Sequence, residues 1–349
     1  MHFIHSDSKK HLEISIWLLT LTIMTFFIII IGGLTRLTNS GLSIVDWRPI
    51  MGIIPPLTHL DWVEVFNNYK VTPEFQIVKK SITLDEFKYI FWWEWFHRFL
   101  ARCIGFVFIC PFLFFWFKNR IPIKLFFSLI LVFAFGLFQA FIGWWMVKSG
   151  LIDNPYVSAY RLSFHLTNAM IIFCILFWST LNSFFEKNIK KDNNKIINIF
   201  FNTGLLFLFI TIISGGFMAG THAGQSFNTF PLMNGAIIPE GYYLEEYKWL
   251  NSFENTVAIN FNHRWLASFT FLLIFFIILY LLVSTKYKSH NFSLLLVLFS
   301  ISLQFMLGLI TLINNVPILL ASMHQTNSVL LLASMLYAYY RHKYTKKKI

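Results

Sequence analysis

Two short stretches place a histidine and an arginine next to each other at the start of an apolar run. They are EWFHR, residues 94–98, and NFNHR, residues 260–264. Ionisable side chains are costly inside a membrane, so a pair that recurs in the same setting is a candidate for function. Imidazole can bind a metal or carry a proton, and guanidinium can hold a carboxylate through two parallel hydrogen bonds. The surrounding elements must show which chemistry these pairs can perform.

The composition predicts an all-α integral membrane protein. Of the 349 residues, 56% are hydrophobic and only 13% are charged. A soluble domain of this size has too little interior to bury so much apolar surface. Eight apolar runs reach the length of roughly 20 residues that a helix needs to cross a bilayer. We predict spans at about 14–34, 90–117, 122–147, 160–184, 199–219, 257–285, 292–314 and 317–340.

Basic residues are distributed unevenly between the two sides of these spans. Eight spans put both termini on one side, and the segments there hold 16 of the 28 Lys and Arg residues but only 4 of the 16 acids. The whole net charge of +12 therefore lies on that side. Because positive segments stay in the cytoplasm, we expect both termini to be cytoplasmic. The basic excess reports topology, so we expect contact with membrane lipids and no binding of nucleic acid.

The two longest connections, about 35–89 and 220–256, are then outside. DWVEVFNNYK and TLDEFKYI in the first connection suggest short helices at the membrane surface.

The two halves of the chain also match each other, since Gly33 pairs with Gly216 and Pro56 with Pro239, both 183 residues apart. Each half has four spans, so both halves share one orientation. We predict two pseudo-symmetric four-helix bundles, residues 1–190 and 191–349.

Four histidines lie at similar expected depth in the second and fourth spans of the two halves. They are His97, His165, His263 and His324. One such histidine is more often a packing residue, but four at repeat-equivalent positions favour ligation. If these helices face each other, His97 opposes His165 and His263 opposes His324, and two facing imidazoles are the usual axial ligands of haem iron in a bundle. Zinc would need further compact ligands, and a proton relay would need acids deeper in the spans.

Charged side chains accompany these histidines. Three arginines, Arg98, Arg102 and Arg264, could pair with haem propionates or could anchor helix ends at the interface. Glu94 lies one helical turn before His97 on the same face, whereas Asn260 occupies the corresponding place in the second half. An acid beside one histidine pair and an amide beside the other suggests that one site holds a permanent haem while the other performs chemistry.

Further motifs match a known family. They include GGLTRLTNSGLSIVDWRPIMGIIPP, YKVTPEF, LDEFKYIFWWEWFHRFLAR, GWWMVKSGL, YRLSFHL, NTFPLMNG and LGLITLINNVPILLASMHQTNSVLLL. Over nearly the whole chain the sequence resembles the haem A synthase family, most closely its proteobacterial and mitochondrial branch. The resemblance implies an oxidoreductase of the bacterial inner membrane that converts a ring methyl of haem O to a formyl group by successive hydroxylations. Haem A for cytochrome oxidase would be the product.

The resemblance also implies roles for individual residues. The cofactor, haem b, is expected at His263 and His324, which bind its iron, with Arg264 beside them. The substrate, haem O, is expected at His97, His165, Arg98 and Arg102. Glu94 falls on the family's acidic residue and, with His97, is expected to be catalytic. Haem O synthase and an electron acceptor are the expected partners, and the alternative function is a membrane cytochrome with two haems that only transfers electrons.

The charge distribution generates a test of topology. A reporter fused to the C-terminus is expected to be inaccessible from outside intact cells, whereas a reporter inserted within residues 220–256 is expected to be accessible. The physical reason is that transferring the basic segments across the membrane is disfavoured. Labelling of the C-terminal reporter by a membrane-impermeant reagent in unbroken cells would contradict the predicted orientation.

Overall fold

A computed structural model describes the chain except for residues 1, 47–50, 153–154, 186–188, 192–194, 285–290 and 347–349. Eight helices in the described ranges are long and apolar enough to cross a membrane. They are α1 (His2–Leu37), α3 (Leu84–Phe117), α4 (Ile123–Ser149), α5 (Ala159–Phe185), α6 (Lys195–Thr221), α8 (Thr256–Val283), α9 (Asn291–Ile313) and α10 (Ile318–Lys343). The prediction of an all-α membrane protein with eight spans is confirmed, and the chain is a multi-pass membrane protein.

Contacts divide the chain into two compact units. One unit is Ile23–Ile172, and the other combines Met1–Thr22 with Phe173–Ile349. Helices α1 and α5 therefore contribute residues to both units. The division into halves 1–190 and 191–349, one for a substrate and one for a cofactor, stays a prediction.

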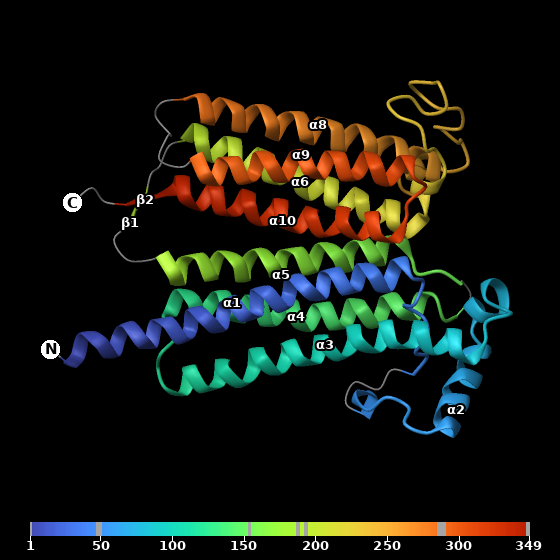
Figure 1. Cartoon of the computed structure of the whole chain (residues 1–349), viewed down its shortest axis with the longest axis horizontal. Coiled ribbons are helices and arrows are strands. Elements are labelled where there is room, and N and C mark those ends of the chain that lie inside the picture. Colours follow the sequence, from blue (N-terminus) through green and yellow to red (C-terminus); the bar gives the residue numbers. More distant parts are fainter. Residues whose placement is uncertain are drawn as a thin grey trace. The chain divides into compact units, whose positions relative to one another are not determined.

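The unit Ile23–Ile172 contains a bundle formed by α1, α3, α4 and α5 (Figure 1). Gly32 of α1 approaches the ring of His97 on α3. Phe108 of α3 stacks on Phe133 of α4, with ring centroids 6.1 Å apart. The Gln139 side chain of α4 donates a hydrogen bond to a backbone carbonyl of α5. Each helix is thus tied to the next along the chain, as short connections in a helical bundle require.

The second unit contains a corresponding bundle of α6, α8, α9 and α10 (Figure 1). Side-chain contacts join α6 to α8, α8 to α9, α9 to α10 and α10 to α6: Thr211–Thr270, Phe271–Phe305, Gln304–Asn327 and Phe201–Tyr339. Two short strands of this unit, β1 (Ile189–Lys191) and β2 (Tyr344–Lys346), pair antiparallel. The second unit also holds a short helix, α7 (Asn251–Glu254), immediately before α8.

The long first connection carries one of the two surface helices expected there. Helix α2 (His59–Lys70) covers DWVEVFNNYK and begins with a capping box between Thr58 and Asp61. The expectation of a second separate helix at TLDEFKYI is wrong, because these residues form the first turns of α3. The Thr83 hydroxyl caps the Glu86 amide and the Glu86 carboxylate accepts from the Thr83 amide, so α3 starts earlier than hydrophobicity alone indicates.

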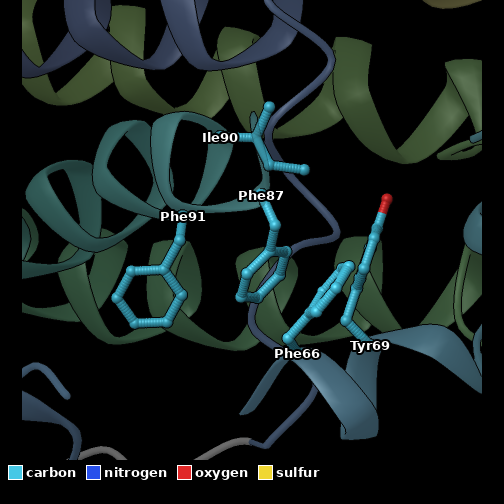
Figure 2. Close-up of a cluster of buried hydrophobic side chains, with 5 residues drawn as sticks. All are labelled: Phe66, Tyr69, Phe87, Ile90 and Phe91. Atoms are coloured by element: carbon cyan, nitrogen blue, oxygen red, sulfur yellow. The ribbon is translucent and has the colours of Figure 1, made fainter. Parts of the chain in front are cut away.

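Helix α2 packs against this extension of α3 through a cluster of buried apolar side chains. Figure 2 shows its members, Phe66, Tyr69, Phe87, Ile90 and Phe91. The Phe87 ring contacts the rings of both Phe66 and Tyr69, with centroids 5.0 and 5.1 Å away. The Tyr69 hydroxyl points out of the cluster and donates a 2.8 Å hydrogen bond to Glu74 Oε2. The cluster fixes α2 on the N-terminal end of α3 by hydrophobic burial.

Glu74 is a buried carboxylate outside the membrane-spanning helices. It begins the short η2 helix (Glu74–Val78) and is 5% exposed. Lys79 Nζ lies 3.2 Å from Glu74 Oε1 and also donates to the Asn39 carbonyl. Burial raises the pKa of Glu74, and Lys79 and the Tyr69 hydroxyl oppose that rise. The connection after α1 and the segment after α2 are therefore joined through one desolvated charge pair.

The raised pKa of Glu74 predicts a pH-dependent stability. The folded state holds this proton more tightly than the unfolded state, so the contribution of Glu74 is greatest below its unfolded pKa of about 4.3 and is lost as pH rises through the folded value. Glu74→Gln cannot ionise. Its thermal midpoint in detergent, relative to wild type, should therefore shift upward as pH increases from about 4 to 7.

The matched control is Glu64→Gln, which makes the same change at an exposed position of α2. Its midpoint should follow the wild-type pH profile throughout. Parallel profiles for Glu74→Gln and wild type would show that ionisation of Glu74 is not linked to folding.

Candidate functional site

Each of the four histidines predicted as ligands lies against a glycine of a neighbouring helix. The facing pairs are His97–Gly32, His165–Gly143, His263–Gly215 and His324–Gly308. A Cβ on these glycines would lie 3.0, 3.2, 3.4 and 2.8 Å, respectively, from the Cε1 atom of the ring. Most of these distances are below ordinary carbon–carbon contact, so the absence of a side chain is what lets the rings sit there. The contact recurs in all four helix pairs of the repeat.

The histidines come together in the two pairs expected from the sequence. His165 on α5 lies close enough to His97 on α3 for protonated rings to repel each other, and the same holds for His263 on α8 and His324 on α10. All four rings are half-buried. Each pair thus offers two imidazoles from different helices of one bundle, which is the donor set for axial ligation of haem iron.

A hydrogen-bonded pair of side-chain amides joins the third and fourth spans of each bundle. These amide pairs were not predicted from the sequence. Asn168 Nδ2 donates to Gln139 Oε1 at 2.6 Å, and Asn327 Nδ2 donates to Gln304 Oε1 at 2.8 Å. Each asparagine lies three residues after a histidine, on the same helical face. The signal was present in the matching stretches FQAFIG and LQFMLG, which contain both glutamines and the glycines that face the rings.

Glu94 is fully engaged by protein groups. Glu94 is 3% exposed, and its Oε1 accepts a 2.6 Å hydrogen bond from Arg98 Nη2. Its Oε2 accepts from Ser43 Oγ at 2.7 Å and from the Ile44 amide at 2.9 Å. These contacts fasten the segment after α1 onto α3. Glu94 and Arg98 are four residues apart on one helix, a spacing at which opposite charges can meet, whereas nothing in the sequence spacing indicates the contacts with Ser43 and Ile44.

In the second half, different contacts hold the segment that follows α6. Asn260 occupies the place of Glu94, and its Nδ2 donates to the Ala223 carbonyl at 2.8 Å. Arg264 Nη2 donates to the carbonyls of Thr229 and Pro231, at 2.6 and 3.2 Å. Arg264 Nη1 is buried without a hydrogen-bond partner among the described residues. One guanidinium nitrogen in this half is therefore available to a carboxylate.

The arginines of the first half are closer to the buried acid. Arg98 Nη2 also donates to the Ile44 carbonyl at 3.0 Å. Arg102 lies one turn further along α3, close enough to Arg98 for their charges to repel. The two guanidinium groups form a small positive region on the same helix as His97, which suits an anionic group bound near the ring.

The glycine contacts predict an unequal effect of the same substitution in one half. Gly308→Ala would place a Cβ 2.8 Å from His324 Cε1, so the ring must move. Gly215→Ala would place one 3.4 Å from His263 Cε1, close to an ordinary contact. We expect purified Gly308→Ala to bind haem about tenfold or more weakly, as when other supports of a metal ligand are lost. Gly215→Ala serves as the control, and equal haem-to-protein ratios by absorption would contradict a close fit at His324.

Comparison with known proteins places the chain in a family. The model of the COX15-CtaA family, described as cytochrome oxidase assembly protein, matches residues 15–336. A heme A synthase of Nitrosomonas eutropha is 42% identical over 340 residues, covering 95% of this chain and 94% of the relative. A heme A synthase of Wolbachia pipientis is 40% identical over 328 residues, covering 93% and 96%.

A third relative, the heme A synthase of Flavobacterium psychrophilum, is 39% identical over 346 residues and covers 95% of this chain and 99% of its own. These matches extend over all eight membrane helices and both histidine pairs. The chain therefore belongs to the COX15-CtaA family of cytochrome oxidase assembly proteins.

Proposed function

We propose that the protein is a haem A synthase, an oxidoreductase that converts a ring methyl of haem O to a formyl group. Haem A made in this way would serve cytochrome oxidase. Membership of the family and relatives named heme A synthase support this function over electron transfer alone. The observation that carries the proposal is that two histidine pairs occupy repeat-equivalent places, while among the described residues a buried carboxylate, Glu94, accompanies the first pair and an amide, Asn260, the second.

The residues present fit haem in the second half. The His263 and His324 rings each lie against a glycine, so no side chain at that position competes for the space that the ring occupies. Arg264 Nη1 offers a buried donor to a propionate. His263 and His324 would hold the iron of haem b and Arg264 would pair with its propionate. When bound, haem b supplies one-electron redox chemistry.

The first half would bind the substrate. Haem O would lie between His97 and His165, with Arg98 and Arg102 close to its propionates. Arg98 already donates to Glu94 at 2.6 Å, so a propionate would share this guanidinium with the carboxylate. Binding of the substrate would therefore be coupled to the ion pair beside it. These assignments make residues 1–190 the substrate half and residues 191–349 the cofactor half.

The reaction requires removal of protons and electrons. Oxidation of a methyl group to a formyl group with water as the oxygen source releases four protons and four electrons. We propose an electron acceptor as one partner and haem O synthase, the source of the substrate, as another. Glu94 would accept a proton at a carboxylate oxygen or orient the reacting water, and His97 would hold the substrate iron. The competing role for Glu94 is structural, since its present contacts fasten the segment after α1.

The protein would act in the bacterial inner membrane. The excess of basic residues in the segments that share a side with the termini supports cytoplasmic termini. Residues 94–98 and 260–264 would then lie toward the outer side of the membrane, and so would both histidine pairs.

One experiment tests the function and the role of Glu94 together. Haems are extracted from membranes of cells that supply haem O and express wild type, Glu94→Gln or no protein. Wild type should yield haem A, and cells without it should not. Glu94→Gln keeps the size and most hydrogen bonding but cannot accept a proton, so haem A formation should fall about 10²–10⁴-fold while haem O accumulates and haem b remains bound.

Glu86→Gln is the matched control, because it makes the same change at an exposed position of the same helix and keeps a capping side chain. It should form haem A at the wild-type rate. A normal rate in Glu94→Gln would reject its acid–base role and leave the structural one. Absence of haem A from wild-type membranes that contain haem O would reject the proposed function.

A further inference from the structure

The four histidine rings differ in what touches their Nδ1 atoms. In the second half, Ser214 Oγ lies 3.2 Å from His263 Nδ1, whereas Gln304 Nε2 lies 3.3 Å from His324 Nδ1 and 3.4 Å from His324 Nε2. In the first half, the Nδ1 atoms of His97 and His165 are buried and have no hydrogen-bond partner within the part of the chain that the structure describes. Both rings of one pair are therefore held by polar side chains, and neither Nδ1 of the other pair is.

The difference at the first ring of each pair comes from one position of the repeat. Ser214 directly precedes Gly215, and Ile31 directly precedes Gly32. These two glycines face the equivalent rings of His263 and His97. A glycine backbone thus approaches the histidine ring in both halves. The residue before that glycine carries a hydroxyl in the second half, Ser214, and none in the first, Ile31.

The second ring of each pair differs through the use of the same amide. Gln139 and Gln304 are equivalent, and each accepts a hydrogen bond from an asparagine. Gln304 then turns its nitrogen toward the His324 ring, whereas Gln139 donates to the backbone carbonyl of His165 at 3.1 Å. Gln139 thus contacts the backbone of α5, and His165 Nδ1 has no hydrogen-bond partner among the described residues.

A partner at Nδ1 has consequences for an iron ligand. When Nδ1–H donates to a fixed oxygen, the ring cannot turn freely and its Nε2 lone pair points in one direction. The same hydrogen bond makes the imidazole a stronger donor to the metal. Ser214 can accept in this way from His263. A ring without such a partner keeps more rotational freedom and binds iron less firmly.

We infer that Ser214 is a positioning residue that fixes His263 for a resident haem, and that Ile31 in its place leaves His97 able to release the haem bound beside it. This inference rests on the proposed function, because it assigns exchange to the half that binds a substrate and retention to the half that binds a cofactor. The serine-to-isoleucine difference then distinguishes a site that holds its haem from one that exchanges it, in addition to the different contacts of Gln304 and Gln139.

The resident site is tested with purified full-length protein carrying haem b. The dissociation rate is measured by transfer of haem to excess apomyoglobin, and the midpoint potential is measured by redox titration. Ser214→Ala should raise the dissociation rate about 10–100-fold and shift the potential upward, because the imidazole becomes a weaker donor. Ser214→Thr retains the hydroxyl and should restore both values. A purely structural role would not move the potential and would not require the hydroxyl.

The exchanging site is tested by the reciprocal change. Ile31→Ser supplies a hydroxyl at the equivalent place, so protein purified from cells that supply haem O should retain several-fold more haem O and haem A per haem b than wild type does. Wild-type dissociation and potential in Ser214→Ala would overturn the role of Ser214. Unchanged retention in Ile31→Ser would overturn the role of Ile31. Haem dissociation is measured without turnover, so failure here is distinct from a wild type that makes no haem A.

Discussion

The close approach of four imidazole rings to four glycines is the constraint on which the rest of the structure depends. A ring with polar nitrogens inside a membrane helix must find a partner, a metal or a water, because the surrounding apolar side chains offer none. Because glycine carries only a hydrogen in place of a side chain, a histidine ring of one helix can fit directly against the backbone of the next. The helix pairs α1–α3, α4–α5, α6–α8 and α9–α10 all use this arrangement. Helix spacing in both bundles follows from it.

Two copies of one arrangement then acquire different properties through a few side chains. Glu94 and Asn260 occupy equivalent places, yet the first brings a carboxylate and an ion pair while the second brings a neutral amide. The arginines that follow the histidines also differ in their partners, since Arg98 pairs with Glu94, whereas Arg264 donates to carbonyl oxygens and lies over the Phe230 ring. The contacts between glycines and histidines recur in both halves, whereas the charged groups around them differ.

Sequence reasoning identified the spans because hydrophobic length is a strong and local signal. The repeat also placed the four histidines on corresponding helices, and their pairing as haem ligands stays a prediction. Sequence reasoning misjudged the start of α3, because a capping box at Thr83 and Glu86 extended the helix through polar residues. Ser43 and Ile44 were not predicted as partners of Glu94, because their contacts come from a segment about 50 positions away along the chain. Such contacts depend on how a connection folds back, which single-sequence periodicity does not encode.

The contacts that hold the segment after α1 against α3 also affect how often this segment opens. Lifting this segment off α3 would break the bonds from Ser43 and the Ile44 amide to Glu94 and the bond from Arg98 to the Ile44 carbonyl. If each is worth about 1 kcal/mol, the lifted state is populated in roughly one molecule in a hundred. In the second half, Asn260 donates to the Ala223 carbonyl and Arg264 donates to the carbonyls of Thr229 and Pro231, so the segment after α6 is also held by three such bonds. All three bonds in the first half involve a charged group, whereas only the two from Arg264 do so in the second, and charge-assisted hydrogen bonds are the stronger kind. On these bonds alone, the segment after α1 should open less often than the segment after α6.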